Sequence, residues 1–474
     1  MSDADLTHPL DLASPRLSVE KPSVRYDKQG ERSDSDRLAA AMTAFTHDFG
    51  RNAAAWLESC IHCGNCAEAC HFYLTTRDPK YTPIWKLQPF KRAYKREAGP
   101  FAWLYKAVGA RSKVTVAELE EWQELIYDAC TMCGRCTMVC PMGIDIASLV
   151  GLARHGMAQA GLVPHELWAV SERAAREGSP LGATPKVLKE RLEWLADENE
   201  VGIHVDLPQA DVLVTFSSIE IMKYPQSLVA TARVMNHAGY TWTISTAGYE
   251  ATNFGMLAGN SEWQKRMTMK MIDAAIACKA KIVVLPECGH AYSAMRWQGA
   301  NMLGQPLPFK VLHISEFLAE NIASGRIAVT AVGKSAAFHD PCQVSRRGGA
   351  TQAPRDVLKA LGVELRETKD SGNLNFCCGG GGGVIANHRA DEIRYKAFGI
   401  KMAQMDATGA DEMVTSCSNC RQSFDDGQAH FGWDRKMGSL LELVADHLAE
   451  PKRDGAPVRP LGARRDPATG AGGA

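Results

Sequence analysis

Eight of the cysteines form two runs with the same spacing, C-x2-C-x2-C-x3-C. They are Cys60, Cys63, Cys66 and Cys70 in the first run, and Cys130, Cys133, Cys136 and Cys140 in the second. Three thiolates at this spacing surround one 4Fe–4S cubane, and the fourth thiolate of each run is expected to reach the other cluster. The spacing therefore predicts two cubanes, with Cys140 completing the first set and Cys70 the second.

Zinc is the alternative metal, because paired C-x2-C units also make four-thiolate zinc sites. Zinc does not need four evenly spaced cysteines followed by proline, as found at Cys140 and Pro141. The first run differs in one respect, since His71 stands where a proline is typical. We therefore expect iron–sulfur clusters at both runs.

Five further cysteines lie in the last third of the chain and exceed what one cubane uses. They are Cys342, the adjacent pair Cys377 and Cys378, and the C-x-x-C pair Cys417 and Cys420. Five glycines, Gly379, Gly380, Gly381, Gly382 and Gly383, follow the adjacent pair. Glycines let the backbone lie close to a cluster, and their N–H groups, those of the first three above all, can face cluster sulfides as an anion-binding nest. A flexible linker or a Rossmann phosphate loop fits this context poorly.

Composition bounds the remaining possibilities. The chain has 474 residues, is 45% hydrophobic and carries a formal net charge of -1, which gives material for two or three domains and no general attraction for nucleic acid. Fifteen cysteines, all but Cys278 and Cys288 in cluster motifs, predict a reducing compartment such as the cytoplasm. We expect residues 1–48 to be a polar, disordered leader and residues 451–474 a disordered tail. No stretch reaches the ~20 apolar residues that span a bilayer.

The elements around the two cysteine runs are predicted to be helical. Apolar residues at helical intervals favour helices over residues 51–70 and 118–140, and the long aromatic segment between them indicates an α-helical ferredoxin rather than a compact one. The basic stretch from Lys86 to Arg96 is either a solvated face or a docking surface for an acidic partner. Helices continue over residues 149–199, so residues 49–200 are expected to form the ferredoxin domain with its connector.

In residues 201–450 the spacing of the apolar residues changes from a helical pattern to short apolar runs. Short buried strands are predicted at 211–216, 239–244 and 281–285, and again at 336–339, 362–365 and 412–415, with helix-length segments between them. Alternating strands and helices imply parallel α/β packing. The fold class is therefore α + α/β: an α-helical ferredoxin domain followed by a pseudo-twofold tandem of α/β half-domains, 201–330 and 331–450.

The first of these halves has lost the thiols. At the five cysteine positions it carries Ser217 or Ser218, Glu250 with Ala251, and Glu287 with His290. Because these residues do not replace thiolates at an iron cluster, one cluster is expected in the tandem. Cys288 and His290 follow a strand end, where sites gather in open α/β sheets. They are either packing residues, or an auxiliary thiol and proton donor, or Cys288 is a lone cluster ligand.

Two residues have alternative predictions of the same kind. His339, next to the second set of strands, is either a strand-end hydrogen bonder or a proton donor, because histidine titrates near neutrality. Cys278 lies on a predicted helix with apolar neighbours and is expected to be a small core residue.

The pattern C…CCG…C-x-x-C resembles the CCG domain of the heterodisulfide reductase protein HdrB, and the helical ferredoxin part resembles its partner HdrC. Their fusion in one chain, over roughly residues 53–449, resembles the family of heterodisulfide reductase HdrD and of DsrK. The resemblance implies one noncubane 4Fe–4S cluster on the five cysteines, which do the chemistry together with Cys288 and His290, and two cubanes that relay electrons.

The same resemblance implies the reaction and the partners. The expected enzyme is an oxidoreductase that interconverts thiols and the disulfide or trisulfide of a small DsrC-like sulfur-carrier protein. A cytochrome b-type membrane subunit of a DsrMKJOP-like complex would exchange the electrons with quinone, on the cytoplasmic face of the inner membrane. Two alternatives stay open: the iron–sulfur subunit of a lactate or glycolate oxidase, and a non-catalytic electron-transfer scaffold. The direction of electron flow does not follow from the sequence.

Overall fold

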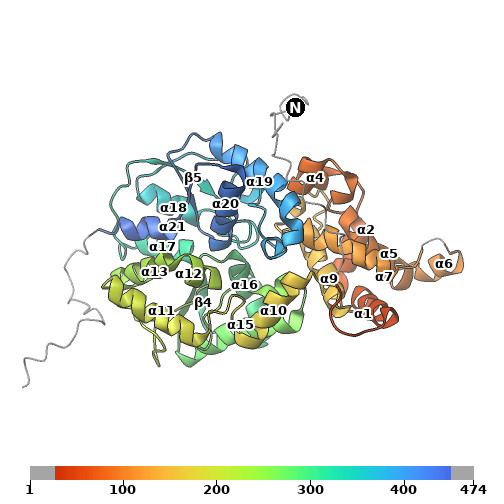
Figure 1. Cartoon of the computed structure of the whole chain (residues 1–474), viewed down its shortest axis with the longest axis horizontal. Coiled ribbons are helices and arrows are strands. Elements are labelled where there is room, and N and C mark those ends of the chain that lie inside the picture. Colours follow the sequence, from red (N-terminus) through yellow and green to blue (C-terminus); the bar gives the residue numbers. More distant parts are fainter. Residues whose placement is uncertain (1–26, 110–111, 450–474) are drawn as a thin grey trace, which may run out of the picture.

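The computed structural model describes residues 27–109 and 112–449, and its first part is helical. In chain order these helices are α1 (Asp34–Thr46), α2 (Gly50–Ser59), α3 (Asn65–Glu68), α4 (His71–Thr76), α5 (Gln88–Glu97), α6 (Ala102–Ala107), α7 (Val116–Gln123), α8 (Arg135–Met138), α9 (Ile146–Gln159), α10 (His165–Glu177) and α11 (Pro185–Glu198). The helices that carry the cysteine runs lie beside the rest of the molecule, at the right of Figure 1. The predicted helical character of residues 49–200 is thus observed in the described residues.

The predicted leader is partly wrong. Its first 26 residues lie outside the described residues, but α1 is a regular helix that Ser33 caps by accepting a hydrogen bond from the Asp36 amide. Phe45 is fully buried on this helix, against α9, and Arg37 donates to the Ala160 carbonyl at 2.9 Å. The helix escaped prediction because its buried face consists of Arg37, two alanines and a single large apolar residue, Phe45. The tail from residue 451 on lies outside the described residues.

Two parallel four-stranded sheets follow, as the alternating pattern predicts. The strands are β1 (Val212–Val214), β2 (Trp242–Ile244), β3 (Ile282–Leu285) and β4 (Lys310–His313) in the first sheet, and β5 (Ser335–His339), β6 (Glu364–Leu365), β7 (Glu412–Thr415) and β8 (Met437–Ser439) in the second. Their orders, β2-β1-β3-β4 and β6-β5-β7-β8, correspond position by position. The edge strands β4 and β8 were not predicted from the sequence.

Helices cover both sheets. They are α12 (Ser218–Lys223), α13 (Pro225–Ala238), α14 (Phe254–Ala258), α15 (Ser261–Ala277), α16 (Gly289–Leu303) and α17 (Ile314–Ala323) in the first half, and α18 (Ala353–Ala360), α19 (Asp391–Asp406), α20 (Ser418–Phe431) and α21 (Leu440–Asp446) in the second. A single hydrophobic core includes Val214 of β1, Phe338 of β5 and Val414 of β7, so the two sheets are packed as one body. No helix in the described part of the chain is long and apolar enough to cross a membrane.

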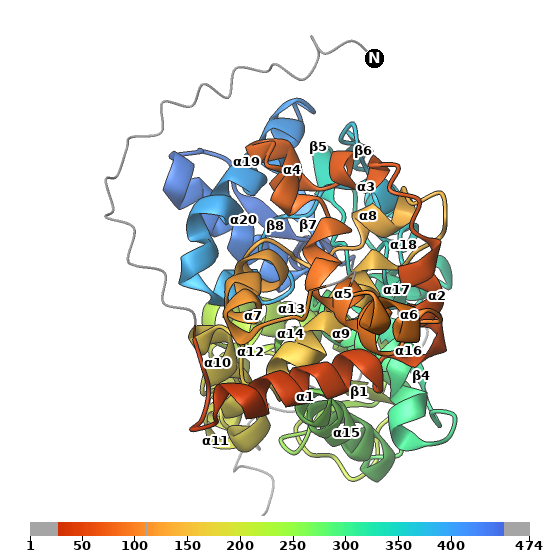
Figure 2. The ribbon, with the colours of Figure 1, turned by 90° about the vertical axis from the view of Figure 1, so that its right-hand side faces the viewer.

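Both α/β halves and the ferredoxin helices meet at one buried arginine. Arg154 on α9 donates to the carbonyls of Ile126 at 2.9 Å and Leu257 at 2.8 Å, and also to those of Cys130 and Gly382. Its side chain is fully buried, so these carbonyls satisfy its donors where water cannot. On the opposite side of the cysteine runs, α4 packs against α19 (Figure 2). The helical part is therefore joined to the second α/β half at several points.

Candidate metal centres

The two ferredoxin-type loops have the same backbone conformation. His62 and Met132, each just before the second cysteine of its run, have φ of 55° and 53°. Gly64 and Gly134, just after that cysteine, have φ of 83° and 75°. Left-handed residues at matching positions curl each loop, and a short helix, α3 or α8, then begins at the next residue. The repeat in sequence is thus a repeat in structure.

The first set of thiols lines a cavity with about 350 Å³ of empty space. The cysteines in its wall are Cys60, Cys63, Cys66 and Cys140. This is the grouping that the spacing predicts, with the last cysteine of the second run joining the first run. Cys63 is exposed, so this centre lies at the surface of the protein.

The second set is more enclosed. Burial, together with the nearby thiols of Cys133, Cys70 and Cys130, raises the pKa of Cys136 well above its ordinary value. Lys86 lies 3.9 Å from the Cys70 sulfur, is 2% exposed and donates to the Ala129 carbonyl. Lys86 therefore belongs to neither a solvated face nor a docking surface.

The rest of the basic stretch is also engaged within the chain. Arg92 pairs with Glu118, and Lys95 pairs with Glu58 at 2.9 Å. Lys91 is 7% exposed and lies 3.3 Å from the His62 ring. Both interpretations are therefore wrong for the buried Lys86 and Lys91, and they stay predictions for the partly exposed Arg92 and Lys95.

The remaining five cysteines converge in one buried place. Cys342 follows β5, Cys377 and Cys378 lie in the loop before α19, and Cys417 and Cys420 lie at the start of α20. Their exposures range from 2% to 5%. The sulfur atoms of Cys378 and Cys420 are 3.4 Å apart, and the thiols of Cys342 and Cys378 hydrogen-bond to that of Cys377. The adjacent doublet thus lies with the other three thiols, as the proposed centre requires.

The glycine run approaches both this centre and the second ferredoxin loop. The amide of Gly379 lies 3.4 Å from the Cys377 sulfur, and the amide of Gly380 hydrogen-bonds to Cys378. Gly382 has φ of 63°, and a Cβ there would lie 2.7 Å from the Thr131 backbone. Glycine is therefore required at Gly382 by its positive φ and by the close approach of two backbones, while Gly379 and Gly380 direct their N–H groups to the thiols.

The two kinds of centre are in direct contact. The thiol of Cys133, a predicted cubane ligand, hydrogen-bonds to the thiol of Cys377. His71 hydrogen-bonds to the Cys377 backbone, and its burial lowers its pKa to about 3, so the ring is neutral. The residue that departs from the usual proline thus links the first run to the five-cysteine site.

In the first half, other side chains occupy the corresponding strand ends. Ser217 follows β1 as Cys342 follows β5, and Glu287 and His290 follow β3 as Cys417 and Cys420 follow β7. His290 accepts a hydrogen bond from the Gly382 amide at 3.3 Å, and burial lowers its pKa to about 4. The neutral ring therefore orients the glycine run.

Cys288 and Cys278 are both buried but differ in surroundings. Burial and the nearby Cys417 thiol raise the pKa of Cys288 above its ordinary value. Cys288 thus lies next to the five-cysteine site, 3.9 Å from the Ala251 carbonyl. Cys278 packs in the core of the first half, as its helical neighbours predict.

Three buried carboxyl groups accompany the emptied positions. Burial raises the pKa of Glu220 to about 7, that of Glu250 to about 7, and that of Glu287 well above its ordinary value. Glu220 forms a capping box with Ser217 at the start of α12. This role was not predicted from the sequence, although the S-x-x-E spacing is typical of such a cap. Glu250 also lines a surface pocket with Tyr249 and Lys270.

The donor set of the five-cysteine site fits an iron–sulfur centre. Soft thiolates select iron–sulfur clusters, and five thiols that form no disulfide meet here. His339 adds an observation of the same kind, since both of its buried ring nitrogens lack a hydrogen-bond partner in the described residues. Groups that a cluster would satisfy are therefore already gathered around the thiols.

Comparisons with known proteins agree with this geometry. Residues 56–144 match the family described as 4Fe-4S dicluster domain, and residues 336–425 match the Cysteine-rich domain, CCG. The D subunit of the dihydromethanophenazine:CoB--CoM heterodisulfide reductase of Methanosarcina mazei is 27% identical over 83% of this chain and 94% of its own. Together these matches support an HdrD/DsrK-like family for this chain.

Other relatives of this HdrD-like protein are also redox proteins. An Hdr-like menaquinol oxidoreductase iron-sulfur subunit of Archaeoglobus fulgidus is 25% identical over 85% of this chain and 81% of its own. The EtfAB:quinone oxidoreductase of Syntrophomonas wolfei is 28% identical over 80% of this chain and 56% of its own. The HdrD-like chain is accordingly an iron–sulfur protein of oxidoreductases, with 4Fe–4S clusters, and its relatives include subunits of larger enzymes.

Proposed function

We propose that this HdrD-like chain is the catalytic iron–sulfur subunit of a membrane-associated complex of sulfur metabolism. It interconverts the disulfide or trisulfide of a DsrC-like carrier protein with thiols. The observation that carries the proposal is the convergence of five buried thiols, adjacent doublet included, against the thiol of Cys133. A centre that only transfers electrons needs four thiolates, whereas a fifth indicates a different cluster with another task.

The order of the centres suggests the path of the electrons. The surface set around Cys63 is accessible to a cytochrome b-type partner, and the enclosed set around Cys136 lies against the five-cysteine site. Reduction of a disulfide consumes two electrons and two protons and yields two thiols. A noncubane cluster held by the five cysteines would supply iron with open coordination for a substrate thiolate, together with one-electron redox chemistry. The chain's own residues hold that cluster: the thiols provide the ligands, and the glycine amides face their sulfurs.

The other parts of the proposal concern organisation. We infer two cubanes and one noncubane cluster, a ferredoxin domain over residues 49–200, and α/β half-domains over 201–330 and 331–450 related by a pseudo-twofold. The matching strand orders support the pseudo-symmetry. Cys288 and His290 border the catalytic site. The chain works on the cytoplasmic face of the inner membrane, and its contact with the lipid is made through the other subunits of a DsrMKJOP-like complex.

The test is spectroscopic. The anaerobically purified protein should contain about twelve iron atoms per chain, and oxidation in the presence of a thiol substrate should give a paramagnetic signal that is absent without thiol. Cys378→Ala should lose this signal and the disulfide reductase activity while keeping both cubanes. The matched control is Cys278→Ala, which removes a buried thiol far from the five-cysteine site. Full disulfide activity in Cys378→Ala would refute the proposal.

A second function rests on the match to EtfAB:quinone oxidoreductase. In that case a flavoprotein, such as a lactate or glycolate oxidase subunit, donates electrons and the five-cysteine site only passes them on. The same preparation separates the two functions. Rapid reduction by a flavoprotein, without any thiol-dependent signal, would support electron transfer alone.

A further inference from the structure

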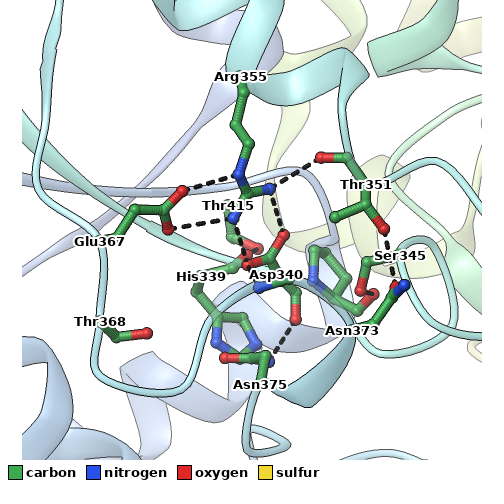
Figure 3. A network of polar contacts seen from close by, with 12 residues as sticks. His339, Asp340, Ser345, Thr351, Arg355, Glu367, Thr368, Asn373, Asn375 and Thr415 are labelled. Carbon is green, nitrogen blue, oxygen red and sulfur yellow. Dashed lines mark hydrogen bonds and ion pairs between the residues drawn. The ribbon is translucent and has the colours of Figure 1, made fainter.

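His339 ends β5, the second strand of its sheet, and its backbone is fixed on both sides. Its carbonyl accepts a hydrogen bond from the Thr415 hydroxyl at 3.0 Å on the neighbouring β7. The next residue, Asp340, is held by the two Arg355 nitrogens at 2.8 and 2.9 Å, and Arg355 in turn by Glu367 (Figure 3). This network sets the direction in which the imidazole leaves the strand.

In the part of the chain that the structure describes, the ring itself has no hydrogen-bond partner. Neither Nδ1 nor Nε2 is paired within the described residues, although His339 is 0% exposed. A neutral imidazole always carries one N–H donor, and leaving a buried donor unsatisfied costs ~1–3 kcal/mol. The Asp340 carboxylate accepts hydrogen bonds from Arg355 and from the Gly372 amide and makes none with the ring, so it does not relieve this cost (Figure 3).

What faces the ring is sulfur. One ring nitrogen and the sulfurs of Cys378 and Cys420 lie within 4.8 Å of one another. Phe424 contacts the ring with centroids 5.1 Å apart. Asn375 (Figure 3) and Lys401 are also near the ring but hydrogen-bond to each other. Buried polar groups without a partner in the protein usually mark a bound water, ion or cofactor.

We propose that His339 donates a ring N–H hydrogen bond to a sulfur atom of the cluster held by the five cysteines. This inference rests on the proposed function, which places that cluster at the site. Five thiols already supply more ligands than a cubane uses, so the imidazole is needed as a donor and not as a further ligand. A hydrogen bond to sulfur stabilises the more negative, reduced cluster and raises its reduction potential. His339 is thus a residue that tunes the potential at which the substrate sulfur is bound and released.

The experiment uses the intact chain with isotopically labelled histidine nitrogen. Pulsed EPR of the five-cysteine cluster should show a weak nitrogen coupling of the size given by a hydrogen bond. His339→Leu should lose the coupling and lower the midpoint potential of this cluster alone. His339→Gln, which keeps an N–H donor, should bring the potential back toward that of the wild type. His237→Leu is the control, because that ring on α13 accepts from the Ala328 amide and belongs to no centre.

Each result has a distinct meaning. A wild-type signal without any histidine coupling, or with the strong coupling of a nitrogen bound to iron, would overturn the inference, and so would an unchanged potential in His339→Leu. His71 and His290 also lie near this site, so the coupling is assigned by its loss in a His339 variant. If His339→Leu does not fold, His339→Gln makes the same assignment, because it removes the labelled imidazole. If the wild type holds only the two cubanes and gives no further signal, the proposed function fails first. The two failures are therefore distinguishable.

Discussion

Replacing Glu250 by glutamine should remove a loss of stability that the wild type suffers as the pH rises from about 4.5 to about 7. Burial raises the pKa of this carboxyl to about 7 from an ordinary value of 4.5. Below about pH 4.5 it is protonated in both states. Above that value the unfolded chain ionises first, which favours unfolding, so stability falls until the folded group ionises near pH 7. At ~1.4 kcal/mol per pKa unit the whole loss is ~3 kcal/mol, of which ~2 kcal/mol falls between about pH 5.5 and about pH 8.

The assay is the urea midpoint of the holoprotein, measured anaerobically across this pH range. Glu250→Gln stays uncharged and should show a flatter dependence on pH, whatever its stability at a single pH. Tyr249→Phe is the control, since it removes the neighbouring hydroxyl bonded to the Ala183 carbonyl and leaves the carboxyl in place. If the glutamine variant and the wild type lose stability in parallel between these pH values, the carboxyl is not held protonated by burial.

Three further predictions concern contacts between the parts. Arg154→Met should lower the free energy of unfolding by ~3–5 kcal/mol. Arg154→Lys should not restore this stability, because one ammonium cannot reach four carbonyls. Urea unfolding measures both variants, and a loss below ~1 kcal/mol would contradict the role of this side chain. Gly382→Ala should cost ~1–3 kcal/mol from its positive φ and the Thr131 backbone together. Gly239→Ala, with φ of 71° and nothing within 4 Å, should cost less, and equal losses in thermal unfolding would mean that the close approach is unimportant. Lys86→Met should lower the midpoint potential of the enclosed cubane, because the substitution removes a positive charge near the Cys70 sulfur. The midpoint potential of the surface cubane should not change. Potentiometric EPR that finds both potentials unchanged would exclude this electrostatic effect.

Much of the architecture could be predicted from the sequence because its signals are local. Cysteine spacing alone leads to the grouping of Cys140 with the first run, which the surface cavity shows. Six strands are apolar runs with helix-length connections, and parallel packing follows from this alternation. The replacements at Ser217 and Glu287 could be located because they keep a fixed distance from the strand ends.

The missed features depend on neighbours that a sequence does not reveal. The edge strands β4 and β8 pair on one side only and need few apolar residues, as in Met437-Gly438-Ser439. Lys86 looks like a surface residue until the fold buries its chain and offers the Ala129 carbonyl to its ammonium. The isolated ring of His339 is visible only once every group around it has been placed.

The hydrogen bond from Arg154 to the Gly382 carbonyl joins residues 228 positions apart. Together with the contact of Cys133 and Cys377 it means that the last part of the chain to be synthesised closes over the first. The five thiols are 2–5% exposed in the closed chain, so a donor of iron would reach them more easily before this closure than after it. The same burial would slow the loss of a bound centre to oxidants in the solvent.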